Sequence, residues 1–355
     1  MKILINGNFL NRNLTGIERF AWETCRRMDA LLTKEDDFSI LIAANAKTFP
    51  EFKNIKIIIS PYSIKSFPKW DMGIFKKACK KLKATGLNFS NTAPKGKFCG
   101  LSFIHDIYAA DHPEDFTSLK DTLIKLYSCF SYRNIARNAR HIFTVSEFSK
   151  KRIMERYGVS EDRISVIPNG WEHFNTVSED DGIFERFPVL LERDFYFTLG
   201  SLSRRKNLAW IARYAEKHPE EHFAISGKAI SGLVPPELEA LKNLNNVTLL
   251  GYVSDGEVKA LMKKCRAFVF PSYYEGFGIP PLEALSTGCR AIVSDAACLK
   301  EIYSDSVNYI NPDSTDVNLG ELLKQEPKGV QEVLKKFTYD RAASLLLDKI
   351  RTVCS

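Results

Sequence analysis

Two glutamates eight residues apart lie in the part of the sequence best suited to chemistry. Glu275 stands in a loop with Gly276 and Gly278, directly after a short apolar run. Glu283 stands in the expected first turn of a helix that a pair of prolines opens. Glycines let backbone amides approach a ligand closely, and a helix amino end offers free N–H groups and partial positive charge. The segment therefore suits a diphosphate, and its carboxylates can accept hydrogen bonds from vicinal sugar hydroxyls. Taken alone, Glu283 fits equally well as a residue that only complements the helix dipole.

Three adjacent cations form the second candidate group. Arg204, Arg205 and Lys206 follow the apolar run 195–199 and precede a helical pattern. Positive side chains at that place would neutralise a leaving diphosphate. A basic cluster is by itself more often a solvated face. Its position directly after an expected strand is what indicates a role in ligand binding.

The N-terminal half holds two further candidates. Gly16 opens the helical pattern 16–31, and His105 with Asp106 follows the end of an apolar run. A lone histidine is more often structural, but ligands of open parallel sheets bind beyond the carboxyl ends of the strands. We therefore take His105 as a functional candidate and leave Asp106 open between function and a turn cap. His112 is expected to be structural.

The elements that must position these residues alternate along the chain. Short runs rich in Ile, Val and Phe indicate buried strands, and longer amphipathic stretches indicate helices. The expected strands are 3–5, 39–43, 55–59, 101–104, 141–145 and 165–167, then 195–199, 222–226, 247–250, 267–270 and 290–294, and the expected helices include 16–31, 118–138 and 338–353. This alternation predicts an α/β protein with parallel sheets covered by helices on both faces. The pattern breaks near 170–185, which predicts domains at 1–172 and 173–336 and a closing helical segment at 337–355.

The segment 268–285 resembles the Glu-x7-Glu signature of retaining glycosyltransferases, in the form found in glycosyltransferase family 4. The matching residues are Pro271, Ser272, Glu275, Gly276, Phe277, Gly278, Pro281, Glu283 and Ala284. Shorter matches lie at 15–20, 103–106, 144–150, 166–170, 199–208, 251–253 and 337–342, so the resemblance runs the length of the chain. The sequence departs from the family at Arg204, where proline is usual, and at Glu18, where a small residue is usual.

The resemblance implies a GT-B fold, with two Rossmann-like doubly wound domains facing each other across a cleft. It also implies that the last helix crosses back to the first domain. Catalytic roles are implied for His105, Arg205, Lys206 and Glu275. Donor binding is implied for Gly16, Gly200, Ser201, Tyr252, Val253, Gly276, Phe277, Gly278, Ile279, Leu282 and Glu283.

The implied activity is transfer of a hexosyl group from a nucleoside diphosphate sugar, with retention of anomeric configuration. The acceptor would be a saccharide or a lipid-linked molecule in surface polysaccharide synthesis. The segments around His105 and Arg205 favour GDP-mannose as donor, while UDP- and dTDP-sugars stay open. No Asp-x-Asp metal motif occurs, so we expect no catalytic metal and no cofactor. Neither Gly-x-Gly-x-x-Gly nor a Walker A sequence is present, which argues against a simple dehydrogenase or NTPase.

Positive charge is concentrated in one segment. Residues 65–97 contain nine lysines and one acid, so they carry more positive charge than the net +7 of the whole chain. The same segment contains Phe67, Trp70, Met72, Ile74 and Phe75, and its part 76–83 is expected to form a basic helix. Contact with anionic lipid headgroups and a solvated basic helix remain equal alternatives. Nucleic acid is not expected as a partner.

The expected compartment follows from the cysteines and the N-terminus. The 8 cysteines include no Cys-x-x-Cys pair, which indicates free thiols in a reducing compartment. Residues 1–7 indicate a first strand rather than a targeting segment, and no apolar stretch approaches the ~20 residues of a membrane span. We expect a cytoplasmic protein, with peripheral contact at the inner face of the membrane as an option.

Two rival functions stay open at this point. The first is another GT-B enzyme, either a phosphorylase or a nucleotide-sugar epimerase. The second is a non-enzymatic basic module that binds a membrane or nucleic acid through residues 65–97.

Overall fold

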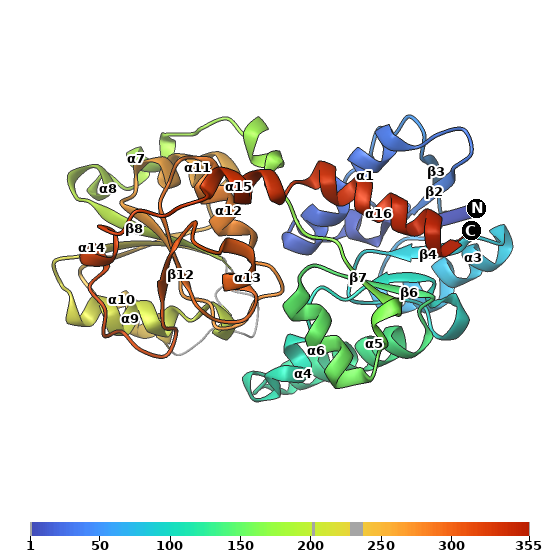
Figure 1. Ribbon diagram of the computed structural model, residues 1–355, viewed down its shortest axis with the longest axis horizontal. Coiled ribbons are helices and arrows are strands. Elements are labelled where there is room, and N and C mark those ends of the chain that lie inside the picture. Colours follow the sequence, from blue (N-terminus) through green and yellow to red (C-terminus); the bar gives the residue numbers. More distant parts are fainter. Residues whose placement is uncertain (1, 201–202, 228–236, 355) are drawn as a thin grey trace. The chain divides into compact units, whose positions relative to one another are not determined.

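The structure, a computed structural model, describes residues 2–200, 203–227 and 237–354. The chain forms two compact units. The N-terminal unit consists of Met1–Phe116, Thr122–Gly170 and Phe337–Ser355, and the C-terminal unit consists of Thr117–Asp121 and Trp171–Lys336. The main boundary follows Gly170, two residues before the expected one, and the end of the chain belongs to the N-terminal unit (Figure 1).

A parallel sheet forms the centre of the N-terminal unit. Its strands are β1 (Lys2–Asn6), β2 (Asp37–Ile42), β3 (Lys56–Ile59), β4 (Thr85–Asn88), β5 (Leu101–Phe103), β6 (His141–Thr144) and β7 (Ile164–Val166). The helices of this unit are α1 (Gly16–Leu31), α2 (Phe67–Lys69), α3 (Lys76–Leu82), α4 (Tyr108–Asp111), α5 (Leu119–Asn138, whose start up to Asp121 is grouped with the C-terminal unit), α6 (Glu147–Tyr157) and α16 (Tyr339–Cys354). The strand order is β3-β2-β1-β4-β5-β6-β7, so the direction of winding reverses between β1 and β4, as in doubly wound Rossmann folds.

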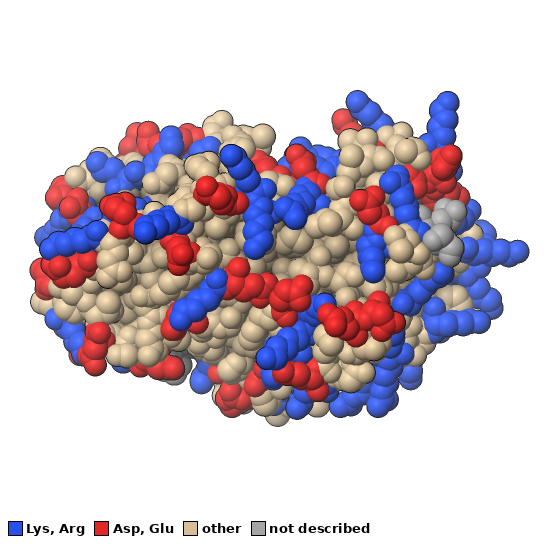
Figure 2. Space-filling view, in the orientation of Figure 1, with Lys and Arg blue, Asp and Glu red and all other residues tan. Residues whose placement is uncertain are grey.

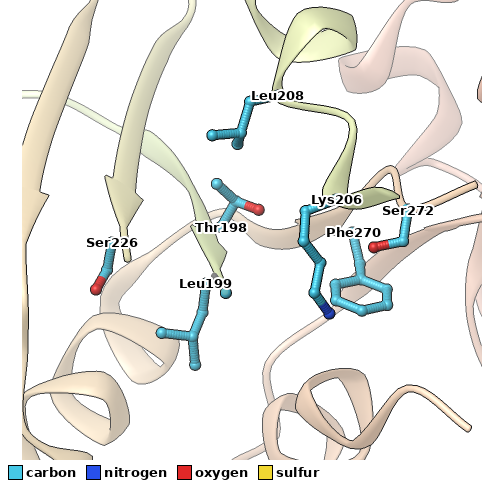
Figure 3. Close-up of a pocket in the computed structure, with 8 residues that line it drawn as sticks. Thr198, Leu199, Lys206, Leu208, Ser226, Phe270 and Ser272 are labelled. Carbon is cyan, nitrogen blue, oxygen red and sulfur yellow. The ribbon is translucent and has the colours of Figure 1, made fainter. Parts of the chain in front are cut away.

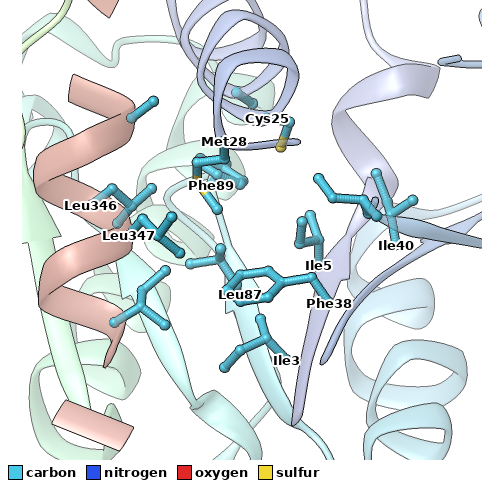
Figure 4. Close-up of a cluster of buried hydrophobic side chains, with 14 of the residues drawn as sticks. Ile3, Ile5, Cys25, Met28, Phe38, Ile40, Leu87, Phe89, Leu346 and Leu347 are labelled. Atoms are coloured by element: carbon cyan, nitrogen blue, oxygen red, sulfur yellow. The ribbon is translucent and has the colours of Figure 1, made fainter. Parts of the chain in front are cut away.

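The two faces of this sheet carry different helices. Successive residues of β1 point to opposite faces, so Ile3 and Ile5 join the cluster with α1 and α16, whereas Leu4 packs with Trp70 and Phe75. Figure 4 shows the first cluster, with Leu87 and Phe89 of the sheet region, Cys25 and Met28 of α1, and Leu346 and Leu347 of α16. Buried residues of α16 recur at helical spacing, so one apolar stripe faces the core. The final helix is therefore part of the N-terminal core.

The C-terminal unit repeats the same topology. Its strands are β8 (Phe195–Leu199), β9 (His222–Ser226), β10 (Val247–Gly251), β11 (Ala267–Phe270), β12 (Ala291–Ser294) and β13 (Asn308–Ile310). Its helices are α7 (Gly182–Arg186), α8 (Val189–Glu192), α9 (Leu208–Lys217), α10 (Glu237–Lys242), α11 (Asp255–Lys264), α12 (Ile279–Ser286), α13 (Leu299–Tyr303), α14 (Leu319–Leu322) and α15 (Val330–Lys336). The order β10-β9-β8-β11-β12-β13 is all parallel, and it reverses between β8 and β11. One face packs on α9, whose Trp210, Ile211 and Tyr214 are buried.

The lysine-rich segment contains more structure than the sequence indicated. It holds α2, a π-helical turn η2 (Trp70–Phe75), α3 and the unexpected strand β4. Trp70 and Phe75 are fully buried in the core, so these two side chains are not available for contact with lipid, one of the two alternatives for this segment. The lysines instead lie on the outside: Lys65, Lys69, Lys77, Lys80, Lys81, Lys83, Lys95 and Lys97 are exposed. The segment is thus a covering layer of the sheet with a solvated basic face.

Candidate functional site

The residues best placed to form a functional site lie at the carboxyl ends of β8 and β11, where the winding of the C-terminal sheet reverses. Crevices at such switch points are the usual ligand sites of open parallel sheets. A small cavity there is lined by Thr198, Leu199, Gly200, Lys206, Leu208, Ser226, Phe270 and Ser272 (Figure 3). Its volume is about 10 Å³, room for about one water molecule. The cavity lies where the ends of β8, β9 and β11 meet the residues that follow β8 and β11.

An ion pair joins those two loops. Lys206 Nζ donates to Glu275 Oε1 at 2.7 Å, and Arg205 NH1 lies 4.0 Å from Glu275 Oε2. The Lys206 ammonium also lies 4.7 Å from the centre of the Phe270 ring, beside which its side chain runs in Figure 3. Burial alone would raise the pKa of the Glu275 carboxyl, but Lys206, Arg205 and Ser272 outweigh it and hold that pKa below its usual value. Glu275 is therefore an ionised, buried carboxylate held by two cations.

Backbone contacts fix the loop that carries these cations. Arg205 C=O accepts from Tyr273 N at 3.0 Å, so the loops after β8 and β11 are directly bonded. Asn207 adopts a left-handed conformation and donates through Nδ2 to Pro271 O at 3.1 Å and Pro312 O at 2.9 Å. Lys206 packs against Gly200, where a Cβ would lie 3.3 Å from the lysine side chain. The turn Arg205-Lys206-Asn207 is thus held in place by contacts of all three residues: the Arg205 carbonyl, the Lys206 side chain and the Asn207 side chain.

The loop after β11 has little freedom. Gly278 has φ +84°, and a Cβ there would lie 2.8 Å from Leu299 Cδ2, so both conformation and space require glycine. Its carbonyl accepts a hydrogen bond from the Tyr303 hydroxyl, and the Glu275 carbonyl accepts from Cys298 Sγ at 3.2 Å. Gly276 and Phe277 are buried as well. The loop is fixed to α13 before any ligand binds.

Glu283 lies on α12 but not in its first turn. The helix begins at Ile279, contains no acid in its first turn, and has Glu283 as its fifth residue, so the predicted position is off by one turn. Glu283 Oε1 is 2.9 Å from His173 Nε2, and both side chains are largely buried. Leu282 is fully buried, so this predicted donor residue can meet a ligand only through its backbone. The structure brings Arg205, Lys206 and Glu275 together, and gives Glu283 a different partner.

The remaining donor predictions in this unit have mixed outcomes. Tyr252 is 74% exposed and follows β10, whereas Val253 beside it is buried. Ser201 lies outside the described residues. Arg204, the departure from the family pattern, is exposed. Tyr252 is thus a surface side chain that a flat ligand group can reach.

His105 is a buried residue of the N-terminal unit. Its ring stacks on Phe103, with ring centres 5.4 Å apart, and its Nε2 lies 2.7 Å from Phe89 O. Burial lowers the pKa of His105, against smaller opposing effects of Phe89 O and Asp106. A neutral ring must carry its proton on Nε2 to bond a carbonyl, which leaves Nδ1 as the acceptor of the ring. Asn91 Oδ1 accepts from the His105 backbone N at 2.7 Å and fixes the start of the loop.

Gly16 and Asp106 have simple local settings. Gly16 is exposed and is the first residue of α1, after Thr15 at the N-cap. Glu18, the other departure from the family, is buried, bonds Thr15 and lies 3.9 Å from Arg12. Asp106 Oδ1 accepts from Tyr108 N at 3.0 Å, the geometry of a turn cap. His112 lies 3.1 Å from Glu114 away from these groups.

A buried polar cluster at the switch point of the N-terminal sheet was not predicted. Asp71 Oδ1 accepts from Asn6 Nδ2 at 2.8 Å and from Asn8 Nδ2 at 3.1 Å, and Oδ2 accepts from Thr92 at 2.8 Å. Asn6 Nδ2 also lies 3.2 Å from Asn88 Oδ1, which ties the ends of β1 and β4. Burial raises the pKa of Asp71, against these hydrogen bonds. A signal existed in the sequence, because Asp71 is the one acid among the lysines of 65–97.

His173 was also missed. It lies in the short helical turn η6 (Glu172–Thr176), 110 residues before its partner Glu283. Nothing in the local sequence marks such a long-range contact.

Within 2–200, 203–227 and 237–354, no group of three or more His, Cys, Asp or Glu side chains is placed to hold a metal ion. In that part of the chain, no helix is both long and apolar enough to cross a membrane.

Comparison with known proteins places this site in context. The family described as "Glycosyl transferases group 1" matches residues 181–327, and "Glycosyltransferase Family 4" matches residues 101–173. The O-antigen chain mannosyltransferase RfbU of Salmonella typhimurium is 29% identical over 214 residues, covering 59% of this chain and 56% of that protein. An uncharacterised glycosyltransferase of Methanocaldococcus jannaschii is 26% identical over 333 residues, covering 83% and 84%. The chain thus matches only about half the length of the Salmonella relative.

The structural comparison agrees on the class of fold. Sucrose-phosphate synthase from Thermosynechococcus elongatus superposes with a TM-score of 0.72 at 15% identity, covering 99% of this chain and 98% of that chain. With its two Rossmann-like units, the chain has the GT-B class of fold. Within that class, the chain is similar to the group 1 glycosyltransferases and to glycosyltransferase family 4.

Proposed function

We propose that this protein is a retaining glycosyltransferase that moves a hexosyl group, with mannosyl favoured, from a nucleoside diphosphate sugar. The proposed acceptor is a saccharide or lipid-linked molecule in surface polysaccharide synthesis. The similarity to a Salmonella O-antigen chain mannosyltransferase supports surface polysaccharide synthesis as the process and mannose as the transferred sugar. We further propose that the protein acts in the cytoplasm, without a metal or other cofactor, and that its exposed lysines attract an anionic membrane surface.

One observation carries the proposal: Arg205 and Lys206 converge on Glu275 at the carboxyl ends of β8 and β11. Two cations beside a glycine-containing loop can neutralise a diphosphate, which is the main electrostatic demand of the reaction. The ion pair with Glu275 holds Lys206 in place before the donor arrives, so little reorganisation is needed on binding. In this proposal the cations act on the leaving group and Glu275 accepts hydrogen bonds from sugar hydroxyls.

The proposed chemistry is a front-face displacement. The bond between the anomeric carbon and the phosphate oxygen breaks, and the acceptor hydroxyl forms the new bond on the same face. Its proton passes to the leaving phosphate, so the protein need not supply a separate general base. Glu275 is a poor candidate nucleophile, because its charge is held by Lys206 and Arg205. His105 would contact the donor through Nδ1, and Glu283 would bind the ribose hydroxyls.

Donor binding and product analysis test the proposal together. Replacing Glu283 by Gln removes a charged acceptor, so we expect a weakening of GDP-mannose binding by roughly 10–100-fold, from the ~1.5–3 kcal/mol of a hydrogen bond to a charged group. The control is Glu216→Gln on the exposed side of α9, which should bind donor normally. NMR of the product should show the anomeric configuration of the donor, and EDTA should leave turnover unchanged. An inverted product, or equal donor affinity in both variants, would contradict the proposal.

A further inference from the structure

His173 and Glu283 form a nearly buried contact within the C-terminal unit. On the face shown in Figure 2, acidic side chains of this unit lie among Lys and Arg at the surface. The Glu283 carboxylate has a histidine instead: its Oε1 lies 2.9 Å from His173 Nε2, and the two side chains are 12% and 2% exposed. An ionised carboxylate only accepts, so Nε2 carries the hydrogen and donates it. Among the described residues, no other side chain forms a hydrogen bond or ion pair with this carboxylate.

Helix α12, which is described throughout, supplies no partner for the Glu283 carboxylate. The hydroxyls of Ser286 and Thr287, one turn further along, donate to backbone carbonyls of the helix at 2.7 and 2.8 Å. Ile279 and Pro280, one turn before, have no polar side chain. A glutamate has several rotatable side-chain bonds, so without a partner it would occupy several orientations. The orientation of this carboxylate therefore depends on His173.

The turn η6, which carries His173, is itself held at several points. Lys259 of α11 donates through Nζ to the carbonyls of Phe174 and Val177 at 3.1 and 2.9 Å. Trp171 Nε1 donates to a backbone carbonyl of α15 at 2.9 Å. These bonds fix the backbone on both sides of His173, so its ring presents the Nε2 donor at a defined place.

Glu283 also lies close to the group that surrounds Glu275. Burial raises the pKa of the Tyr303 hydroxyl, and Cys298, Glu283 and Glu275 add to this rise. Both glutamates are therefore near the same buried hydroxyl, which itself bonds the loop after β11. The contact between His173 and Glu283 thus belongs to the surroundings of the candidate site.

We propose that His173 is a positioning residue of the donor site, which holds Glu283 Oε1 so that the rest of the carboxylate faces the ribose hydroxyls of the donor. This inference rests on the proposed role of Glu283 in binding the ribose. An ionised carboxylate has about four acceptor positions, so the bond to His173 leaves room for both the 2′- and the 3′-hydroxyl. Because the carboxylate is oriented before the donor arrives, less conformational freedom is lost on binding. The preference for a ribonucleotide over its 2′-deoxy form therefore depends on His173.

Calorimetric titration of the full chain with matched nucleotides tests this role. The probes are GDP, UDP and ADP, each beside its 2′-deoxy form. The wild type should bind its preferred ribonucleotide roughly 10–100-fold more tightly than the 2′-deoxy form, because the missing hydroxyl donates to a charged group. Replacing His173 by Leu removes the donor and keeps a side chain of similar size. His173→Leu should therefore lower this preference by at least about fivefold, and Glu283→Gln should also lower it.

A conservative variant and a second histidine provide the controls. The amide N–H of glutamine can donate to the same carboxylate oxygen, so His173→Gln should keep the preference within about threefold of the wild type. His222 is also buried, at the amino end of β9, and its Nε2 lies 2.8 Å from Thr248 Oγ1. His222→Leu should lower the melting temperature, as His173→Leu does, without changing the preference.

The possible outcomes distinguish the role of His173 from the proposed function. A wild-type preference that Glu283→Gln lowers but His173→Leu leaves intact would overturn the role of His173 alone. Equal weakening of the ribonucleotide and its 2′-deoxy form in His173→Leu would show that the contact is only structural. A loss of the preference in His173→Gln and His222→Leu as well would assign the effect to reduced stability. No binding of any probe, or equal wild-type affinity for both forms, would contradict the proposed ribose site itself.

Discussion

Replacing Lys206 by Met tests the ion pair on which the candidate site rests. The substitution keeps most of the volume of the side chain and removes the ammonium that lies 2.7 Å from Glu275. The exposed fractions of the two side chains are 13% and 7%, so the carboxylate would remain buried. Loss of one partner from a buried pair costs about 3–5 kcal/mol. Because Arg205 remains 4.0 Å from the Glu275 carboxylate, we expect a loss of about 2–3 kcal/mol in the free energy of unfolding.

The loss should depend on pH in a defined direction. In the native protein the pKa of Glu275 is below its usual value, so its ionised form contributes stability at neutral pH that is lost as the pH falls through the folded pKa. Without Lys206, burial dominates and raises the pKa of Glu275, so the carboxyl takes up a proton at higher pH and the penalty disappears. The difference between the two proteins should therefore be larger at about pH 7.5 than at about pH 5.

Urea unfolding followed by circular dichroism measures both effects. Lys217→Met is the control, because Lys217 pairs at 3.3 Å with Asp316 and both side chains are mostly exposed. Such a pair contributes ~0–1 kcal/mol, so the control should be nearly neutral. The double variant Lys206→Met/Glu275→Gln should recover at least half of the loss. A cost of Lys206→Met no greater than that of the control, or one that does not shrink in acid, would contradict a stabilising ion pair between Lys206 and Glu275.

Two further predictions concern stability. Gly278→Ala should lower the free energy of unfolding by about 2–4 kcal/mol in thermal or urea melts, since the alanine would have a left-handed backbone and a Cβ only 2.8 Å from Leu299 Cδ2. The control Gly96→Ala, with φ +70° and open space around its Cβ, should cost only about 1–2 kcal/mol. Similar costs for the two variants would contradict the contribution of the Leu299 contact. Burial, helped by Lys349 and Arg163, lowers the pKa of His141 to about 4, so its neutral form stabilises the fold and that contribution is lost as the pH falls below about 6.5. His141→Asn should therefore flatten the stability profile by about 1–2 kcal/mol between about pH 7.5 and pH 5 in urea melts, and an unchanged slope would show that His141 does not titrate in that way.

Local patterns predicted most of the framework. The helix 16–31 was placed at its observed ends, and the strands 195–199, 222–226 and 267–270 also agree with the structure. These predictions are correct because the apolar periodicity of each element and the turns that bound it lie within a few residues of one another. The two sheets, the break near Gly170 and the cation-bearing loop after β8 follow from the same signals.

Elements with weak local signals were missed. Strand β4 has the sequence Thr-Gly-Leu-Asn, with a glycine and few apolar residues, and it forms because β1 and β5 flank it. Strand β13 (Asn308–Ile310) is similarly short and is formed by pairing with β12. Tertiary pairing, rather than strand propensity, determines both.

Side-chain partners were the least predictable part of the site. The sequence indicated that Lys206 and Glu275 serve one site, but not that they pair with each other. The contact of Glu283 with His173 and the burial of Asp71 both depend on residues far apart in sequence. For residues 65–97 the sequence left lipid contact and a solvated basic helix as equal alternatives, because composition alone does not show that Trp70 and Phe75 face the core.

The most direct test of the central claim is a thermal-shift panel of the purified protein with GDP, UDP, dTDP and ADP, each with and without EDTA. A nucleotide that binds only the folded state raises the melting temperature by mass action. We expect one nucleotide, with GDP favoured, to raise the melting temperature clearly more than the others, with a shift that EDTA does not change and that is lost in Lys206→Met and Glu283→Gln. No shift with any of the four, from folded protein, would contradict the proposed donor site.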